Sequence, residues 1–484
     1  MDDKKLAGSL ISGVSWLLSG TSIQAVLQII VLIILARILS PEDFGIITAA
    51  QIIINFSLIF AQLGVGPALI QKKNISDNTI RTGNTISIVF GITLFALTFF
   101  MSEFIERFFE IKDLSLVIKI LSISFIFQSV SVIYESLFYR AFKYNIIATS
   151  EVIAYLVGYG FLSIILAYLG YGYMSLVYGI LAKFAIKTLF LVSKSKIQFG
   201  FGYSKKEAKE ILLFGGGMTL SKIYNYFALQ ADNVIIGRFL NAELLGMYSK
   251  AYHLISMPAN LIGGALDKAL FPILSAIQDE LDKVVVYYYS ILSLICIILL
   301  PLSIILLFNS EIIILLILGN QWTEIAPVFG LLVIALFFRT AYKISVSTLR
   351  SIGLVYKNAH FQLLYAVKTI IFSLIGIRYG AIGVAFGVLM AIISIYFVLY
   401  FYTSNKIKSE SYNLISTHID GFILLITMLL FMLFIVHFGF HGYITLLISL
   451  KFYIIITLTY IYSTKFYKRN FILKIYDEKY NSAR

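Results

Sequence analysis

Charged residues that could do chemistry are rare in this chain, and one cluster lies in ILARILSPEDFG, residues 34–45. It places Glu42 and Asp43 between two long apolar runs. Two neighbouring carboxylates beside a membrane can bind a metal ion or act as a general base. The same stretch is also typical of a helix start, with Ser40 as N-cap, Pro41 at the first helical position and Asp43 completing a capping box.

An internal repeat decides between these two interpretations. Shifted by 201 residues, the stretch meets IIGRFLNAELLG, residues 235–246, in which Arg, Leu, Glu and Gly recur at the same places. Leu244 replaces Asp43, so the second copy lacks the carboxylate pair. The capping chemistry is kept, because Asn241 can cap and Glu243 lies in the first turn, where the helix dipole favours an anion. We therefore predict that both stretches turn the chain and that neither is catalytic.

Positive charges inside apolar segments form the second candidate group. Each costs about 2.5–3.5 kcal/mol at the centre of a lipid-exposed helix, so we expect these side chains to face a hydrated interior. They are Lys222, Lys250, Arg339, Lys343, Lys368 and Lys451. Three others, Lys119, Lys183 and Lys187, lie near helix ends and are expected to snorkel. Glu135 and Glu151 are expected near the cytoplasmic interface, paired with Arg140 or Lys143.

Polar residues recur at helical spacing on the same segments. The stripes are Thr21, Gln24 and Gln28; Gln51, Asn55 and Gln62; Lys222, Asn225, Tyr226 and Asn233, with Asp232 at the edge; Lys250, His253, Met257, Gly264 and Asp267; and Arg339 with Lys343. Such stripes indicate a cavity lining, and interhelical hydrogen bonding is the alternative for Gln and Asn. For the cations a cavity is favoured, because nearby acids are too few. The predicted substrate-binding residues are Lys222, Arg339, Lys343, Lys250, Lys368, Asn225, Gln51, Asn55, Gln24 and Gln28.

Composition shows what must position these residues. The chain has 484 residues, of which 60% are hydrophobic and 13% are charged. Soluble domains carry about twice that charged fraction, so this is an integral membrane protein. With about 20 apolar residues per crossing, we predict fourteen spans, of which the seventh and eighth are the least hydrophobic. They are 13–36, 44–70, 82–101, 114–138, 146–168, 171–193, 211–237, 244–267, 284–308, 325–348, 359–377, 380–402, 418–436 and 442–462.

The repeat also predicts the architecture. Six spans separate its two copies, so the two halves run in the same direction and form two six-helix lobes around a central cationic cavity. Parallel repeats of this kind are typical of alternating-access transporters. We predict an all-α membrane protein with an N-terminal lobe at 1–205, a C-terminal lobe at 206–405, and two further helices with a basic cytoplasmic tail at 406–484.

Metal, disulfide and nucleic-acid chemistry are not expected. Cys296 is the single cysteine, so no disulfide can form within the chain. His437 and His441 are four residues apart, but Gly439 and the loop context argue against a metal site. No cofactor is expected. The net charge of +13 lies mainly on the cytoplasmic face, where it matches anionic lipid headgroups. We expect the N-terminal apolar run to be retained as a first helix, because it lacks a small-residue cleavage site.

Several stretches carry a family resemblance in the same order along residues 10–360. They are LARILSPEDFGIITAA, YRAFKYNIIATSEVI, LGYGYMSLVYG, ADNVIIGRFLNAELLGMYSKAYHL, LFPILSAIQDE and GNQWTEIAPVFGLLVIALFFRT. In them the chain resembles the polysaccharide-unit flippases of the multidrug/oligosaccharidyl-lipid/polysaccharide exporter superfamily, relatives of the O-antigen and teichuronic-acid exporters. The resemblance implies export of undecaprenyl-diphosphate-linked oligosaccharide without catalytic residues. It fixes no sugar, and Met174 departs from the tryptophan usual at that position in the family.

Two other functional classes are alternatives. A multidrug antiporter or peptidoglycan-precursor flippase of the same superfamily is the first; an antiporter would be expected to carry acids in the N-terminal lobe, yet residues 13–35 and 44–71 are uncharged. A polysaccharide polymerase or ligase is the second, and it would need a large outer loop. Expected partners are the lipid-linked oligosaccharide, membrane lipids, H⁺ or Na⁺ as coupling ion, and a polymerase and other assembly proteins. The expected location is a bacterial or archaeal cell membrane.

The distribution of basic residues generates a prediction about topology. The segments assigned to the cytoplasm hold 24 Lys and Arg and the outer loops hold 5, which places both termini in the cytoplasm. Cysteines introduced at positions 200 and 470 should therefore be shielded from impermeant reagents in intact cells, and a cysteine at position 316 should react. External labelling at position 200 would overturn the fourteen-span arrangement.

Overall fold

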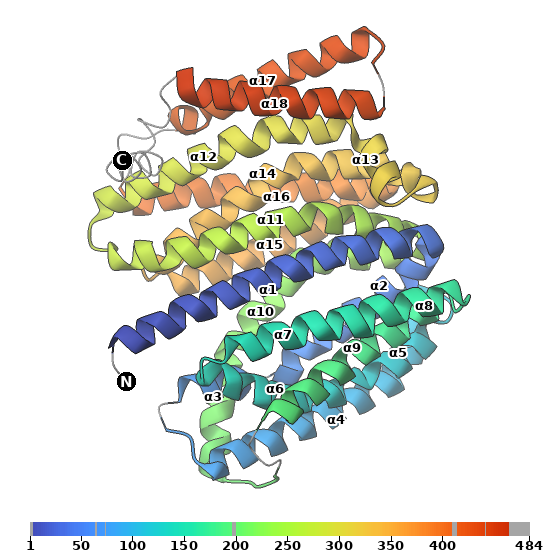
Figure 1. The fold of residues 1–484 in the computed structure, drawn as a ribbon, viewed down its shortest axis with the longest axis vertical. Coiled ribbons are helices and arrows are strands. Elements are labelled where there is room, and N and C mark those ends of the chain that lie inside the picture. Colours follow the sequence, from blue (N-terminus) through green and yellow to red (C-terminus); the bar gives the residue numbers. More distant parts are fainter. Residues whose placement is uncertain are drawn as a thin grey trace. The chain divides into compact units, whose positions relative to one another are not determined.

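The computed structural model describes residues 3–62, 65–72, 74–195, 200–408, 414–440 and 442–463. Within the helices it describes only the backbone at 3–15, 17–18, 61–62, 214–221, 265, 267–269, 355–356 and 416. The described residues form helices and no strand (Figure 1), which confirms the prediction of an all-α fold. They belong to two compact units, Met1–Met247 and Tyr248–Arg484. The lobe boundary at 205/206 stays a prediction from the repeat.

The first unit contains ten α-helices, a π-helix and the start of an eleventh α-helix in its described part. In order these are α1 (Asp3–Ile38), α2 (Pro41–Gln62), α3 (Val65–Gln71), α4 (Asp77–Phe109), α5 (Leu114–Ser122), α6 (Ser124–Arg140), α7 (Tyr144–Ile153), the π-helix η1 (Ala154–Phe161), α8 (Leu162–Tyr168), α9 (Tyr173–Lys194), α10 (Lys205–Phe239) and α11 (Ala242–Ala276). The helices α4, α5, α6 and α9 lie side by side, and α1 packs on α7 and α8 (Figure 1).

The second unit is built around α12 and α14. Its elements after α11 are α12 (Leu281–Phe308), α13 (Ser310–Ile317), the 3₁₀-helix η2 (Asn320–Ile325), α14 (Ala326–Ser351), α15 (Val355–Gly376), the 3₁₀-helix η3 (Ile377–Tyr379), α16 (Gly380–Lys406), α17 (Leu414–His437) and α18 (Tyr443–Ser463). The helix α12 contacts both α14 and α17, and α16 contacts both α14 and α15.

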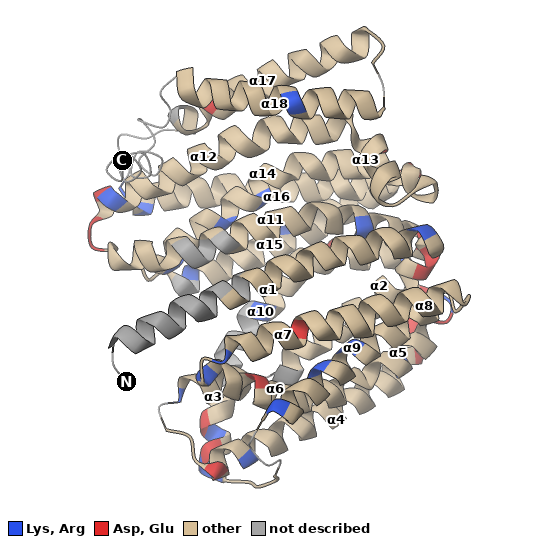
Figure 2. Ribbon diagram, viewed as in Figure 1, with Lys and Arg blue, Asp and Glu red and all other residues tan. Residues whose placement is uncertain are grey.

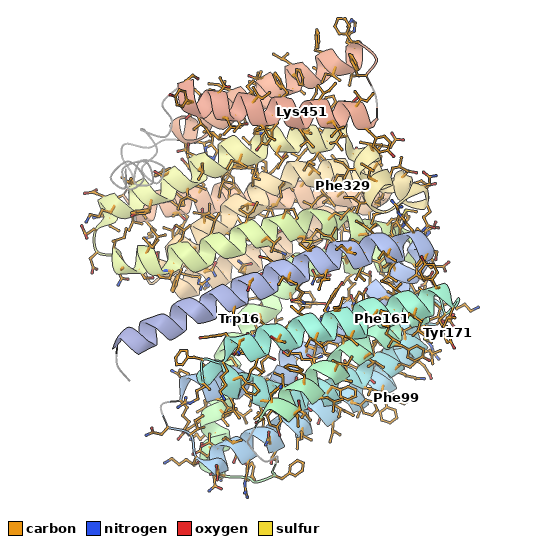
Figure 3. All side chains as sticks on the ribbon, viewed as in Figure 1. Trp16, Phe99, Phe161, Tyr171, Phe329 and Lys451 are labelled. Atoms are coloured by element: carbon orange, nitrogen blue, oxygen red, sulfur yellow. The ribbon has the colours of Figure 1, made fainter. Side chains whose placement is uncertain are left out.

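Many of these helices suit a lipid environment. Eleven stretches of the described helices are long and apolar enough to cross a membrane. One of them, residues 357–406, contains both α15 and α16, and α10 and α11 are not among the eleven although each has 35 residues. The fourteen predicted spans are compatible with this arrangement. Phe161 projects from η1 and Tyr171 from the connection between α8 and α9 (Figure 3). Much of the charge lies towards helix ends (Figure 2).

Several predicted spans are interrupted in the structure. The predicted span 114–138 is divided between α5 and α6, because at Ile123 the backbone amide donates to the carbonyl of Ile120, a 3₁₀-type bond. The predicted span 146–168 contains the eight-residue π-helix η1. Local sequence pattern does not reveal this change, since η1 is as apolar as its neighbours. A Cβ added at Gly158 would lie 2.5 Å from the backbone nitrogen of Lys183, so this backbone contact with α9 depends on glycine.

The repeat predicted from the sequence reappears in the helix boundaries. The helices α1 and α10 end at Ile38 and Phe239, and α2 and α11 begin at Pro41 and Ala242, so both boundaries keep the 201-residue offset. The amide of Ser40 donates to Asp43 Oδ2 at 2.9 Å, and the amide of Asp43 donates to Ser40 Oγ at 3.2 Å. The predicted capping box is therefore confirmed.

The second copy is capped as predicted too. The amide of Leu244 donates to Asn241 Oδ1 at 2.7 Å. In the first copy the carboxylate of Asp43 also accepts a hydrogen bond from the hydroxyl of Ser40 at 2.8 Å. Asp43, one of the two carboxylates considered for catalysis, therefore stabilises the start of a helix.

The starts of α2 and α11 touch through two glycines. A Cβ added at Gly45 would lie 1.7 Å from the carbonyl oxygen of Ala242, and one added at Gly246 would lie 1.8 Å from the carbonyl oxygen of Pro41. The two contacts are equivalent under the 201-residue offset. Only glycine permits this backbone-to-backbone approach, so the motif has a second role that its capping chemistry does not reveal.

Hydrogen bonds between aromatic and hydroxyl side chains hold α17 against the rest of the second unit. His418 is 4% exposed, donates from Nδ1 to the carbonyl of Leu414 at 2.8 Å and contacts the hydroxyl of Tyr396 through Nε2. The hydroxyl of Tyr400 on α16 also contacts Thr417 of α17. Two further hydrogen bonds, Tyr288 to Ser345 and Tyr289 to Ser404, join α12 to α14 and α16. Gly421 packs directly on Cys296, because a Cβ there would lie 2.4 Å from Cys296 Sγ.

The ion pairs correct part of the sequence-based expectation. Glu135 and Glu151 both pair with Lys187, not with Arg140 or Lys143, so Lys187 does not snorkel as expected. Arg140 instead donates to carbonyl oxygens at the C-terminal end of α3. These contacts form between helices distant in sequence, which local spacing cannot predict.

A second ion cluster joins the segment after α3 to the start of α10. Lys72 pairs with Glu207 and, at 2.8 Å, with Glu210. The hydrogen bond with Lys72 lowers the pKa of Glu207, and the hydrogen bonds with Glu207 and Glu210 raise the pKa of Lys72. The ion pair is therefore strongest at intermediate pH, where both groups are charged. It weakens when Glu207 is protonated at acidic pH or Lys72 is deprotonated at strongly alkaline pH.

The glycine contact generates a prediction. Gly45→Ala should lower the thermal midpoint of the purified protein, because the new methyl group overlaps the carbonyl oxygen of Ala242. Overpacking of this kind costs about 1–3 kcal/mol or more. Gly264→Ala on α11 is the matched control, since an added Cβ there meets nothing within 4 Å. Equal midpoints for both variants would contradict the contact.

Candidate functional site

Two cations on α14 are held by α11. Arg339 is 5% exposed, donates from Nη1 to Ser256 Oγ at 3.2 Å, and lies with its guanidinium 4.3 Å from the ring centre of Tyr252. An arginine over an aromatic face is attracted by the ring's electrons and is held in one orientation. One turn later, Lys343 donates to Asn260 Oδ1 at 2.7 Å. These contacts place both charges along one side of α11.

The chain leaves space for Lys343 at a glycine. A Cβ added at Gly263 would lie 2.7 Å from Lys343 Cδ, so a larger residue would displace the lysine. The ammonium group also lies 3.4 Å from the carbonyl oxygen of Ala259. Two neutral oxygen atoms are thus among the groups that orient Lys343 at this site.

The face of α11 that contacts α14 differs from the stripe that the sequence analysis selected. Tyr252, Ser256 and Asn260 are spaced four residues apart and form the contact. The stripe of Lys250 and His253 lies roughly 100° around the helix from it, at 3.6 residues per turn. Sequence reasoning missed the contact residues, although their regular spacing is a signal that could have found them.

In the first unit the predicted polar residues of α2 and α10 lie on neighbouring helices. The hydroxyl of Tyr226 on α10 donates to the carbonyl of Ile52 on α2 at 2.6 Å, and its ring packs on Phe56. Four predicted residues are distributed over these helices: Gln51 and Lys222 are half-buried, and Asn55 and Asn225 are exposed. The structure thus brings two of the predicted stripes to adjoining helices.

The remaining predicted residues are placed elsewhere. Gln24 and Gln28 are half-buried on α1, which packs on α7, η1 and α8. Lys250 on α11 and Lys368 on α15 are half-buried in the second unit. Lys368 follows Tyr365, whose ring packs 5.9 Å from that of Tyr342 on α14. Each unit therefore carries its own group of predicted residues.

The site offers binding groups and no evident catalytic set. Among the described residues, no group of three or more His, Cys, Asp or Glu side chains is arranged to hold a metal ion. The groups that the structure does bring together are ammonium, guanidinium, amide, hydroxyl and aromatic. Such groups can bind a polar anion reversibly by charge-assisted hydrogen bonds.

Comparison with known proteins gives a consistent result. A family model described as "Polysaccharide biosynthesis protein" matches residues 34–327. The chain is 26% identical over 407 residues to the lipopolysaccharide biosynthesis protein WzxC of Escherichia coli K12, covering 83% of this chain and 82% of that protein. It is 23% identical over 345 residues to the teichuronic acid biosynthesis protein TuaB of Bacillus subtilis 168, covering 71% of each.

The fold is similar to that of a solved transporter. The lipid II flippase MurJ, in an inward closed conformation, matches with a TM-score of 0.77 over 94% of this chain and 99% of its own. The two sequences are 19% identical, so this likeness concerns the fold alone. It confirms the membrane-helical fold class predicted from the sequence.

The contact at Asn260 generates a prediction about hydration. Asn260→Cys should react with a charged, water-soluble thiol reagent, because Asn260 is exposed beside Lys343 and we expect that region to be wet. Native Cys296, which is fully buried, should not react, and Phe386→Cys, exposed on an apolar surface, should react at least about tenfold more slowly, since apolar surroundings suppress the thiolate. Equal rates at 260 and 386 would contradict a hydrated cavity.

Proposed function

Because the chain belongs to the polysaccharide biosynthesis protein family, we propose that it is a flippase for lipid-linked oligosaccharides. It would move polyprenyl-diphosphate-linked repeat units from the cytoplasmic to the outer leaflet by alternating access, for surface polysaccharide assembly. It would act as a transporter and not as an enzyme. The observation that carries this proposal is a pair of cations on α14, a helix long and apolar enough to cross a membrane. These cations, Arg339 and Lys343, contact Ser256 and Asn260 of α11.

A diphosphate is the substrate group that these cations suit. It presents several oxygen acceptors and roughly two negative charges, and arginine and lysine are the side chains that bind phosphate oxygens. Each charge-assisted hydrogen bond contributes about 1.5–3 kcal/mol. The bonds must remain few, because the outward-facing state has to release the lipid. Lys222, Lys250 and Lys368 would extend the cationic lining.

Sugars would be accommodated by the uncharged polar residues. Gln24, Gln28, Gln51, Asn55 and Asn225 carry amide groups that can donate to and accept from hydroxyl groups. An oligosaccharide needs a hydrated path, whereas its polyprenyl tail can remain in lipid. The division between cations and amides therefore matches the two polar parts of such a substrate.

The proposed orientation makes export favourable. With both termini in the cytoplasm of a bacterial or archaeal cell, an anion leaves a negative interior. The membrane potential then contributes about 2.3 kcal/mol per charge per 100 mV. Lipids of the cytoplasmic leaflet would meet the basic loops, and a polymerase acting on the outer leaflet would receive the product.

The alternatives are weaker on particular observations. The likeness to the lipid II flippase is one of fold at 19% identity, so it does not favour a peptidoglycan precursor. A multidrug antiporter is disfavoured by the uncharged first two spans, at 13–35 and 44–71. A polymerase or ligase is disfavoured by two relatives that are named as transporters, the succinoglycan biosynthesis transport protein ExoT of Rhizobium meliloti and a putative O-antigen transporter of Shigella flexneri. The short connections between the described spans also disfavour it.

A leaflet assay tests the proposal. Deleting the gene should leave the lipid-linked unit on the cytoplasmic leaflet, accessible to an impermeant glycosidase only in inside-out vesicles, with glycosyltransferase activities unchanged. Complementation with Lys222→Ala, Arg339→Ala or Lys343→Ala should restore outer-leaflet delivery to about one tenth of the wild-type level or less. Each variant loses a charge-assisted hydrogen bond to the substrate.

The control variant is Lys119→Ala, which removes a cation paired with Glu103 at the exposed end of α5. It should restore delivery nearly as well as the wild-type chain. Finding the lipid-linked unit on the outer leaflet of the deletion strain, with only polymerisation lost, would reject the flippase and favour an enzyme. Normal delivery by all three cavity variants would reject the cationic cavity.

A further inference from the structure

A half-buried ion triad lies in the first unit and contains none of the predicted substrate-binding residues. Lys187 on α9 pairs with Glu151 Oε1 on α7 at 2.6 Å and with Glu135 Oε2 on α6 at 2.9 Å. The side chains of Lys187, Glu135 and Glu151 are 14%, 23% and 29% exposed. One ammonium group thus serves two carboxylates on two other helices, and the triad carries one excess negative charge. Figure 2 shows acidic positions on α6 and α7 and basic positions on α9.

The surrounding groups do not form a second close pair. Lys183, one turn before Lys187, lies with Nζ 5.8 Å from the ring centres of Tyr155 and Phe184. The other titratable side chains on these elements are Tyr134, Tyr139 and Arg140 on α6, Tyr144 on α7, Tyr155 and Tyr159 on η1, and Tyr173, Tyr178 and Lys194 on α9. The helix α2 lines the adjoining cavity with the apolar Leu58. Lys183 is thus an additional cation one turn from Lys187, and it contacts aromatic rings.

A cavity opens on one carboxylate of the triad. Its volume is about 140 Å³, and it is lined by Leu58, Gln128, Ser129, Ser131, Val132, Glu135, Phe184 and Lys187. A water molecule occupies about 30 Å³ in the liquid, so the cavity has room for an ion and water. Gln128 Nε2 is buried without a hydrogen-bond partner among the described residues. Glu135 lines this cavity and Glu151 does not, so the two carboxylates are inequivalent.

The backbone beside the triad has an unusual form. The π-helix η1 begins at Ala154, three residues after Glu151, and runs to Phe161. π-helical segments are rare and frequently occur at functional sites, since they interrupt the regular α-helical bonding. Gly158 of η1 touches the backbone of Lys183 on α9. The triad therefore adjoins a helix segment whose backbone hydrogen bonds depart from the α-helical pattern.

We propose that this cavity binds one monovalent cation, H⁺ or Na⁺, at Glu135, and that this ion is the coupling ion of the flippase proposed above. Binding neutralises the excess charge of the triad, and Lys187 then remains paired with Glu151. For H⁺, a proton passes from water to Glu135 Oε2 and later returns to water on the other side of the membrane, while Lys187 keeps its own protons. The inference rests on the proposed function, and it names residues that the cation-lined site does not use.

The first test is ion binding by the purified full-length chain in liposomes, without substrate. Infrared difference spectra on acidification at constant Na⁺, or on adding Na⁺ at constant pH, should show a carboxylate change in the wild-type chain. Glu135→Gln should lose that change, and Glu103→Gln, the same substitution at an exposed ion pair with Lys119, should keep it. A Glu135→Gln spectrum that matches the wild type would overturn the proposal.

The second test is coupling, with lipid-linked oligosaccharide in the same liposomes. A one-unit pH gradient or a tenfold Na⁺ gradient should shift its distribution between leaflets about tenfold for each cation coupled. A response to the pH gradient alone assigns H⁺, a response to the Na⁺ gradient alone assigns Na⁺, and Glu135→Gln should respond to neither.

The outcomes separate the two proposals. If the wild-type chain translocates the lipid but neither gradient shifts it, the coupling site is overturned and the flippase stands. If the wild-type chain translocates nothing, the flippase proposal fails, and the spectra alone decide whether Glu135 binds a cation.

Discussion

The contact between Gly45 and Gly246 is the constraint on which the arrangement of the repeat depends. Helix axes normally pack 8–10 Å apart because side chains separate them, and here each glycine meets a backbone carbonyl of the other helix. The approach brings together two helix N-termini, which are both positive ends of helix dipoles. Asp43 and Glu243 lie in these first turns. Their negative charges offset the repulsion between the two positive helix ends. Acidic residues in the first turns and glycine packing therefore stabilise the same contact.

The two units handle buried charge differently. In the second unit, Arg339 and Lys343 are oriented by a hydroxyl, an amide and an aromatic ring. In the first unit, Lys187 is shared by two carboxylates. Breaking an ion pair away from bulk water is expensive unless another charge replaces the lost partner. The shared Lys187 therefore suits a small cation as ligand, whereas the cations of the second unit suit an organic anion.

Local features of the fold could be predicted from the sequence. Caps, helix boundaries and the repeat offset follow from residues that are neighbours along the chain, and Ser40, Asp43 and Asn241 confirm them. Long-range pairing could not be predicted, because it depends on helix rotation. Lys187 was expected to snorkel, yet α9 turns it toward Glu135 and Glu151.

The candidate site was predictable to a similar degree. The cost of a cation in an apolar helix selected Arg339 and Lys343 as candidates, and the structure buries Arg339 and half-buries Lys343, while their role in binding stays a prediction. It did not identify Ser256 and Asn260 as their partners, because Lys250 and His253 drew attention to an adjacent face of α11. Small polar residues give a weak signal in a single sequence, and only the packing of α14 on α11 shows which face is used.

The hydrogen-bonded aromatic cluster around His418 has a mechanical consequence. Directional bonds from Tyr396 and Tyr400 hold α17 in one register and rotation against α16, where purely apolar packing would tolerate sliding. The contact of Gly421 with Cys296 adds a steric stop to the same interface. The helix α17, which lies outside the repeat, therefore has few independent degrees of freedom. A helix restrained in this way adds apolar surface to the bundle without adding another hinge.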